Sequence, residues 1–355
     1  MKKRNNNIDF LRGIATLCII LIHTAFWTGE MYLPAWFKNL TLLVDVPVFM
    51  YISGISFSYV NSVSKNIVLL IKQWKKWIFF ILIYTLLILI FKNEQFAIKD
   101  FICWLAYYFP NDTFFIVVQG SIWFWVMYIK VTIIGSIIIC INNYLEKNKE
   151  KNKRNLIYIL LLVTLIFMYT TLSGINEFIF DSKTWMFILI YLFGYLTVNY
   201  KIDLKKTLLY ETIIILTTFI LFFGFGYKIT NIQTLKFEFS MVYLPFAFIS
   251  IVLFWYLKDS LKIKENNPIN YIGKNAIWFY FAQGISSSLL FSIYPYVKNH
   301  RDIIVFSIML FINILLSSII AYVLEKTYNY VEKIEASDKI KKLVKNISPQ
   351  AINSK

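Results

Sequence analysis

Residues 8–26 read IDFLRGIATLCIILIHTAF, an almost unbroken apolar run that contains one arginine, Arg12, and one histidine, His23. Its length is close to the roughly 20 residues that an α-helix needs to cross a hydrocarbon core of about 30 Å. An arginine near the centre of such a segment costs about 2.5–3.5 kcal/mol on insertion scales. The stretch therefore predicts a membrane-spanning helix and raises the question of what Arg12 and His23 do within it.

Apolar blocks of similar length recur along the whole chain of 355 residues, which is 58% hydrophobic and 19% aromatic and has a mean hydropathy of +0.61. This apolar share exceeds that of an ordinary soluble domain. We expect an all-α fold, a polytopic helical membrane bundle with about ten transmembrane helices. The ten expected spans are about 8–27, 41–60, 77–92, 122–142, 155–172, 184–199, 207–226, 239–257, 275–294 and 303–324.

The chain outside these spans contains one ambiguous segment and one polar tail. Residues 101–118 are apolar but are interrupted by Pro-Asn-Asp, which favours a partly inserted or interfacial piece. Residues 1–325 are expected to form one membrane domain, and residues 326–355 a polar, lysine-rich cytoplasmic tail. No small-residue cleavage site follows the first apolar run, so we expect it to be retained as a helix.

The basic residues are distributed unevenly between alternate loops. The expected inner segments are 1–7, 61–76, 143–154, 200–206, 258–274 and 325–355. They contain 26 of the 36 Lys and Arg residues. This asymmetry is the positive-inside pattern and predicts that both termini are cytoplasmic. The net charge of +16 therefore indicates membrane topology, with lipid as a partner, and no nucleic-acid partner is expected.

The three cysteines do not form a recognisable site. Cys18, Cys103 and Cys140 are odd in number and lie in apolar or aromatic surroundings. They match neither a disulfide framework nor a zinc-ligand spacing. We therefore predict no metal cofactor.

Arg12 and His23 are expected to share one face of the first helix. They are eleven residues apart, which corresponds to about 20° around a helix and about 16 Å along it. Asp9 and Thr16 lie near the same face. Two simpler explanations remain open: Arg12 reaches the membrane surface and pairs with Asp9, and His23 makes an interhelical hydrogen bond. The other histidine, His300, falls in an expected outer loop, where solvation explains it.

Asp45 lies near the start of the second expected span, by the outer membrane surface. There it can pair with a histidine, bind an acceptor sugar or face water. Further along, Pro47 and the pair Ser53-Gly54 interrupt the helix pattern. Small residues favour close helix contacts in membranes, so packing and a functional role for Ser53 stay equally open.

Lys72, Lys75 and Lys76 form a three-lysine cluster at the expected inner membrane face. Such a cluster can mark topology or contact anionic lipid. It can equally hold the phosphates of a ligand that arrives from the cytoplasm. Lys130 lies about eight residues into the fourth span, where an ionisable residue is a functional candidate by default; the sequence does not indicate its partner.

Four segments resemble motifs of the membrane-bound acyltransferase-3 family. Residues 8–23 match its arginine–ten residues–histidine motif, and 49–54 (FMYISG) resemble its Phe-Phe-x-x-Ser-Gly motif. Residues 120–130 (GSIWFWVMYIK) resemble a Trp-Phe segment that opens a later helix, and 271–283 (YIGKNAIWFYFAQ) resemble a late Gly-Lys segment. The likeness spans most of the chain, and ten helices are the usual core of this family.

Two positions depart from the family pattern. Where relatives have Arg-x-x-Arg after the second helix, this chain has Lys-Gln-Trp-Lys at 72–75. The charge is kept, but the bidentate guanidinium fork is lost. Where relatives often end the late segment with histidine, this chain has Gln283, which can form hydrogen bonds but cannot act as a base at neutral pH.

The resemblance implies transfer of an acyl group, commonly acetyl from acetyl-CoA, to a hydroxyl of a carbohydrate. Cell-surface polysaccharides and their lipid-linked precursors are the typical acceptors. His23 would then act as general base or carry the acyl group itself. Arg12 would position the donor or stabilise charge, Asp9 would orient Arg12, and the three-lysine cluster would bind acyl-CoA.

An export function is the main alternative. Intramembrane charges and a bundle of about ten helices also suit an exporter of polysaccharide or lipid-linked sugar. Consumption of acyl-CoA separates the two classes. We see no appended hydrolase-like domain in the sequence, so we expect transfer to be completed in the membrane domain or together with separate polysaccharide-assembly proteins.

Overall fold

Helices dominate the computed structural model and lie over all ten expected spans. The structure describes residues 5–28, 33–60, 62–92, 98–105, 115–145, 149–173, 182–238, 240–297 and 303–352. The α-helices are α1 (Asn6–His23), α2 (Ala35–Leu40), α3 (Val46–Val60), α4 (Val63–Lys92), α5 (Ile98–Leu105), α6 (Ile116–Leu145), α7 (Lys149–Ser173), α8 (Ser182–Thr197), α9 (Leu204–Gly224), α10 (Ile232–Glu238), α11 (Ser240–Ser260), α12 (Pro268–Lys274), α13 (Ala276–Val297) and α14 (Ile303–Ile352). The shorter turns are the π-helix η1 (Thr24–Thr28) and the 3₁₀ helices η2 (Thr41–Leu43) and η3 (Ile229–Asn231).

Nine helices in the described part of the chain are long enough and apolar enough to cross a membrane. The expected polytopic helical bundle is therefore confirmed, with nine helices of spanning length instead of about ten. The remaining expected span, 184–199, corresponds to α8, which has 16 residues. That length gives about 24 Å at 1.5 Å per residue, short of the hydrocarbon thickness.

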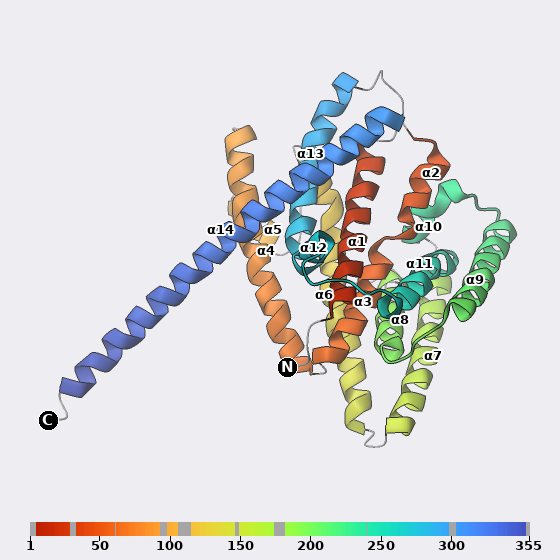
Figure 1. Cartoon of the computed structure of the whole chain (residues 1–355), viewed down its shortest axis with the longest axis horizontal. Coiled ribbons are helices and arrows are strands. Elements are labelled where there is room, and N and C mark those ends of the chain that lie inside the picture. Colours follow the sequence, from red (N-terminus) through yellow and green to blue (C-terminus); the bar gives the residue numbers. More distant parts are fainter. Residues whose placement is uncertain are drawn as a thin grey trace.

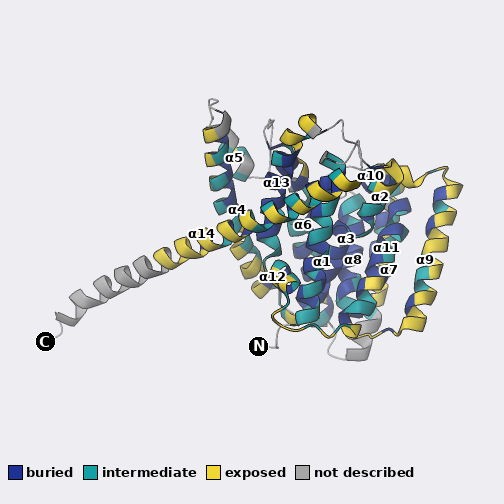
Figure 2. Ribbon diagram, turned by 45° about the horizontal axis from the view of Figure 1, so that its top comes forward, coloured by how far each residue is buried: buried dark blue, intermediate teal, exposed yellow. Residues whose placement is uncertain are grey.

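The helices differ strongly in how much of their surface is covered. Figure 2 shows buried residues concentrated on the central helices α3 and α8, and exposed residues along α9 and α14. α9 lies at one edge of the bundle, and α14 crosses the bundle and continues past it (Figure 1). Most of the exposed side chains of α9 are apolar, including Phe219 and Phe223, as expected for a helix that faces lipid.

The structure can be compared with two further expectations, the domain boundary at residue 325 and the segment 101–118. α14 runs without interruption across the boundary between residues 325 and 326. The division of the chain into a membrane domain and a tail stays a prediction. Of the segment 101–118, α5 and α6 contain the two ends, and residues 106–114 lie outside the described residues.

Two glycines let α3 and α8 cross at very short distance. A Cβ added at Gly54 would lie 1.9 Å from the carbonyl oxygen of Tyr191. One added at Gly194 would lie 2.2 Å from the carbonyl oxygen of Tyr51. Both positions therefore exclude any larger side chain, and the packing interpretation of Gly54 holds.

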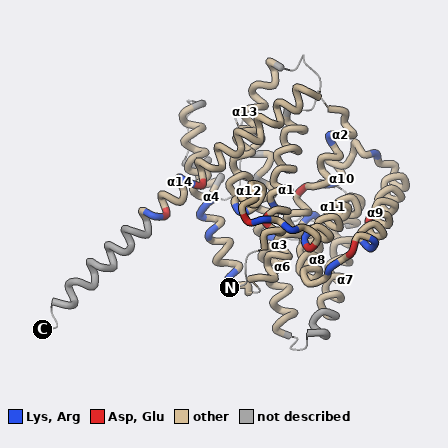
Figure 3. Tube along the Cα trace, in the orientation of Figure 1, with Lys and Arg blue, Asp and Glu red and all other residues tan. Residues whose placement is uncertain are grey.

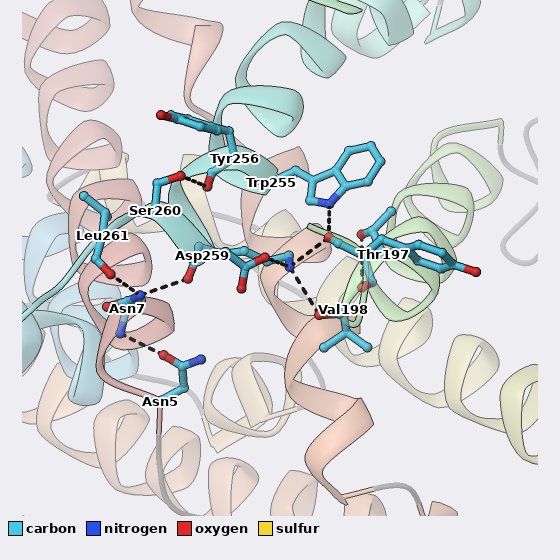
Figure 4. A network of polar contacts seen from close by, with 12 residues as sticks. Asn5, Asn7, Thr197, Val198, Trp255, Tyr256, Asp259, Ser260 and Leu261 are labelled. Atoms are coloured by element: carbon cyan, nitrogen blue, oxygen red, sulfur yellow. Dashed lines mark hydrogen bonds and ion pairs between the residues drawn. The ribbon is translucent and has the colours of Figure 1, made fainter. Parts of the chain in front are cut away.

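A polar network fixes the start of α1 against the ends of two other helices (Figure 4). The side-chain amide of Asn7 donates to the carbonyl oxygens of Lys258 at 2.9 Å and Leu261 at 2.7 Å. The Lys258 ammonium donates to the carbonyls of Val198 and Tyr200, each at 3.2 Å. Cations and amides near helix C-termini satisfy carbonyls that have no intrahelical partner. The network thus sets where the polar face of α1 begins.

The charged residues gather near helix ends. Figure 3 shows them on the loop between α11 and α12 and at the start of α9, whereas the lengths of most helices carry few. This distribution suits a membrane-spanning bundle. Which side is cytoplasmic stays a prediction.

Candidate functional site

A cavity of about 720 Å³ lies within the bundle, a volume in the range of ligand-binding pockets. Its walls come mainly from α1, α3, α4, α6, α10, α12 and α13. The charged or titratable Arg, His, Asp and Lys residues that line it are Arg12, His23, Asp45, Lys76, Lys236 and Lys274. This is a high content of ionisable groups for the interior of a membrane bundle.

The polar face of α1 opens onto this cavity. Arg12, Thr16 and His23 all line it, as their shared helix face predicts. The eleven-residue spacing therefore places a cation and an imidazole at different depths of one cavity, about 16 Å apart along the helix axis.

Arg12 is held by contacts from two helices. Its Nη1 lies 3.3 Å from Oδ1 of Asp9, and its Nη2 donates to Oγ of Ser56 at 2.8 Å. Asp9 is buried and does not itself line the cavity. The predicted Asp9–Arg12 contact is present, and the arginine borders the cavity. α12 approaches closely here, because a Cβ added at Gly273 would lie 1.7 Å from the carbonyl oxygen of Asp9.

His23 is the last residue of α1, at the point where the helix widens into η1. Single π-helical turns inside α-helices occur frequently at functional sites. The Nδ1 atom of His23 is buried and has no hydrogen-bond partner among the described residues. The interhelical hydrogen bond considered for His23 is therefore not found at this ring nitrogen.

The turn after His23 is anchored by α14. Nδ2 of Asn313 donates to Oγ1 of Thr24 at 2.8 Å and to Oγ of Ser287 at 3.0 Å. Oγ of Ser286 donates to Oδ1 of Asn313 at 2.6 Å. All four of these side chains are essentially inaccessible. The contacts tie η1 to α13 and α14 directly beside His23.

Asp45 forms a buried ion pair with Lys236 of α10. Of the three roles open for Asp45, neither pairing with a histidine nor facing water describes this arrangement. The Lys236 ammonium also lies 4.9 Å from the ring centroid of Trp123, a distance typical of a cation–π contact. The charges of both partners act on His23. The two charges act on it in opposite directions, so loss of either one alone would change the local field at the histidine end of the cavity.

Sequence reasoning did not single out Lys236. Residues 227–238 lie between two expected spans and outside the expected inner segments, yet α10 folds back and brings Lys236 into the cavity wall. One signal was present, because Lys236 is flanked on both sides by large apolar residues, Leu235 and Phe237. An isolated cation between apolar neighbours indicates partial burial.

The three-lysine cluster divides between the cavity and the outer surface. Lys76 lines the cavity, and its ammonium lies 5.2 Å from the ring centroid of Trp278. Lys72 and Lys75 are exposed on α4 and are not part of the lining. Lys274, at the end of α12, does line the cavity and was not singled out from the sequence, although it lies in the segment 271–283.

Some of the remaining candidate residues line the cavity and others do not. Ser53 and Gln283 line the cavity. Lys130 is half-buried on α6 and is not part of the lining. His300 lies outside the described residues.

The two ends of the cavity differ in composition. The basic end carries Arg12, Lys76 and Lys274. The aromatic end, reached along α1 past His23, carries Phe26, Trp27, Trp123, Phe237 and Phe291. Two of its ring pairs meet edge to face, Trp27 with Phe291 at 6.0 Å and Trp123 with Phe237 at 5.3 Å between centroids.

Several buried polar groups in the lining have no hydrogen-bond partner among the described residues. They belong to His23, Gln73, Trp125, Thr132, Tyr191, Gln233 and Gln283. An unsatisfied buried polar group costs about 1–3 kcal/mol. Their concentration around one cavity indicates a site that receives a polar ligand.

Metal ligation is not indicated within the described residues. No group of three or more His, Cys, Asp or Glu side chains gathers there in a way that could hold a metal ion. Cys18, Cys103 and Cys140 are not joined in disulfides.

The fold and the cavity together define a polytopic membrane protein with a ligand-sized interior site. The family model of the acyltransferase-3 acyltransferase domain matches residues 5–322. Because this match covers most of the chain, the protein belongs to the acyltransferase-3 family and is a membrane acyltransferase. Comparison with curated proteins found no match, and comparison with solved structures found none either.

Proposed function

We propose that the protein transfers an acyl group, acetyl in the simplest case, from acyl-CoA to a carbohydrate hydroxyl. The acceptor is a cell-surface polysaccharide or its lipid-linked precursor, and the site of action is the cell membrane. The observation that carries this proposal is one continuous cavity in which His23 lies between a basic end and an aromatic end.

The basic end suits the donor. Coenzyme A carries several phosphate groups, and lysine binds phosphate as a point charge. Lys76 and Lys274 both border the cavity there, whereas the charge of Arg12 is balanced in part by Asp9. We expect this end to face the cytoplasm, where acyl-CoA is found, because the basic residues follow the positive-inside pattern. The thioester arm then extends along the polar face of α1 toward His23.

The aromatic end suits a sugar. Aromatic rings offer flat apolar faces to the C–H surface of a sugar ring, and a few placed polar groups then fix its orientation. Trp27, Trp123 and Phe291 supply such faces. Oε1 of Gln233, which has no partner among the described residues, supplies an acceptor for a hydroxyl.

His23 is the group suited to proton transfer between the two ends. Its near-neutral intrinsic pKa favours a general base. In the proposed step, His23 accepts the hydroxyl proton, the sugar oxygen bonds to the acyl carbon, and the carbon–sulfur bond breaks. The departing thiolate then takes the proton from His23, so that the products are an ester and free coenzyme A.

Glycan analysis combined with an enzyme assay tests this function. Surface glycans from cells with and without the gene are compared for ester groups, and purified protein in lipid nanodiscs is supplied with acetyl-CoA with and without acceptor. We expect loss of ester groups from an otherwise retained polymer, and acceptor-dependent release of coenzyme A. Loss of the surface polymer itself, without any consumption of acetyl-CoA, would instead establish the export function.

A further inference from the structure

Gln283 is the described residue of the cavity wall whose side-chain amide is buried with both of its polar atoms unpartnered. Its side chain is 1% exposed and lines the cavity, yet neither Nε2 nor Oε1 has a hydrogen-bond partner among the described residues. Burying a whole amide in this way is unfavourable unless a ligand completes its hydrogen bonds. The helix-packing alternative gives no reason for a polar side chain here.

Gln283 lies close to the level of His23. Asn313 bridges Thr24, the residue after His23, to Ser287 of α13. Gln283 precedes Ser287 by four residues, which is about one turn on the same face of α13. α13 also packs against both α1 and η1. The amide therefore borders the part of the cavity where the imidazole lies.

Two cationic donors of the cavity wall already have acceptors. Lys236 is paired with Asp45, and Arg12 with Asp9 and Ser56. Two side-chain N–H groups of the lining, apart from the imidazole, are buried without a partner among the described residues: those of Gln283 and Trp125. Trp125 is held in an aromatic stack with Trp77, with ring centroids 6.1 Å apart.

We propose that Nε2 of Gln283 donates a hydrogen bond to the carbonyl oxygen of the acyl group during transfer, which makes Gln283 a catalytic residue. This inference rests on the proposed acyl-CoA chemistry. As the sugar oxygen bonds to the acyl carbon, electron density moves onto the carbonyl oxygen, and it returns when the carbon–sulfur bond breaks. A fixed N–H donor at that oxygen stabilises the transient charge.

Two acyl-CoA analogues distinguish this role from simple packing. In the ketone analogue, a methylene replaces the thioester sulfur and the carbonyl stays; in the thioether analogue, the sulfur stays and a methylene replaces the carbonyl. We expect the wild-type protein to bind the ketone about tenfold more tightly, the size of one net hydrogen bond. In Gln283→Met, which keeps the side-chain volume, this preference should disappear and kcat should fall about 10²-fold.

Two control variants make the result decisive. Thr85→Val removes a buried polar group, the Thr85 hydroxyl, that has no partner among the described residues and does not line the cavity. This variant should keep the ketone preference. Trp125→Phe removes the rival N–H group. If Trp125→Phe abolishes the preference and Gln283→Met keeps it, the indole holds the carbonyl and the proposal for Gln283 is wrong.

The proposed function and the role of Gln283 fail in different ways. If wild-type protein binds neither analogue, acyl-CoA is not the donor and the function itself is wrong. If wild-type protein binds both and Gln283→Met, with unchanged thermal stability, retains the ketone preference, only the role of Gln283 is overturned.

Discussion

The basic end of the cavity and the region around His23 use polar groups in different ways. At the basic end, Arg12 is already bonded to Asp9 and Ser56, and Lys76 lies against an aromatic ring. Around His23, the ring Nδ1 and the side-chain amide of Gln283 are buried without a hydrogen-bond partner among the described residues. Charge attraction acts over distance and tolerates small displacements, whereas hydrogen bonds to a reacting group require fixed geometry. Substitution of His23 itself should therefore lower turnover most, whereas substitutions at the basic end should mainly weaken binding of the donor.

The largest effect is expected for His23→Ala. Loss of a general base typically lowers the rate about 10²–10⁴-fold, while the apolar helix should still insert. Acyl transfer per correctly folded molecule, measured in detergent-purified protein, gives the comparison. Cys18→Ala, on the same helix but outside the cavity lining, should retain wild-type turnover. Turnover of His23→Ala within a few-fold of wild type would rule out a catalytic role.

The second-largest effect is expected for substitutions in the buried pair Asp45–Lys236, and it should act mainly on stability. Removing one partner of a buried ion pair leaves an uncompensated charge and costs about 3–5 kcal/mol. Lys236→Met and Asp45→Asn should each be strongly destabilised, and the double variant should recover most of the lost stability. Denaturation of the four proteins in one detergent measures this coupling. Additive losses in the double variant would show that the two residues act independently.

The activity of the double variant shows whether the ion pair matters for the reaction as well as for folding. Because Asp45 and Lys236 both line the cavity that contains His23, the folded double variant should remain less active than wild type. Full activity in this variant would mean that the ion pair serves folding alone.

The sequence predicted those features that depend on helix periodicity. The shared face of Arg12 and His23 and the Asp9–Arg12 contact follow from spacing within one helix, and close packing at Gly54 follows from the small size of the residue. These relations survive whatever the surrounding helices do. For the same reason, the polytopic helical fold was predictable from the apolar blocks alone.

Features that depend on packing between distant helices were not predictable. Lys72 and Lys76 are one turn apart on α4, yet Lys76 alone reaches the cavity, where it lies against Trp278 of α13. Lys236 enters the site because α10 folds back into the bundle. The π-helical turn after His23 is likewise anchored from α14 by Asn313. None of these arrangements is encoded in local spacing.

A moderate effect is expected at the basic end. Lys76→Gln with Lys274→Gln should weaken binding of acyl-CoA about tenfold at low ionic strength and reduce the dependence of binding on salt. The matched pair Lys72→Gln with Lys75→Gln, exposed on the same face of the membrane, should change binding less than about threefold. Equal losses in both pairs would restore the broader prediction that the whole three-lysine cluster binds the donor.

The smallest effect is expected for Asn313→Leu, which removes the contacts that anchor the turn after His23. Side-chain hydrogen bonds within membrane proteins contribute about 0.6 kcal/mol each on average. Loss of the bonds to Thr24, Ser286 and Ser287 should therefore lower stability by about 1–2 kcal/mol and turnover a few-fold, as His23 becomes less well positioned. Ser318→Ala is a suitable control on α14, because its hydroxyl donates to the carbonyl of Ile314 in its own helix. A loss of more than about 10²-fold, the size expected for a catalytic group, would show that Asn313 takes part in the reaction directly; unchanged stability and turnover would show that the anchor does not position His23.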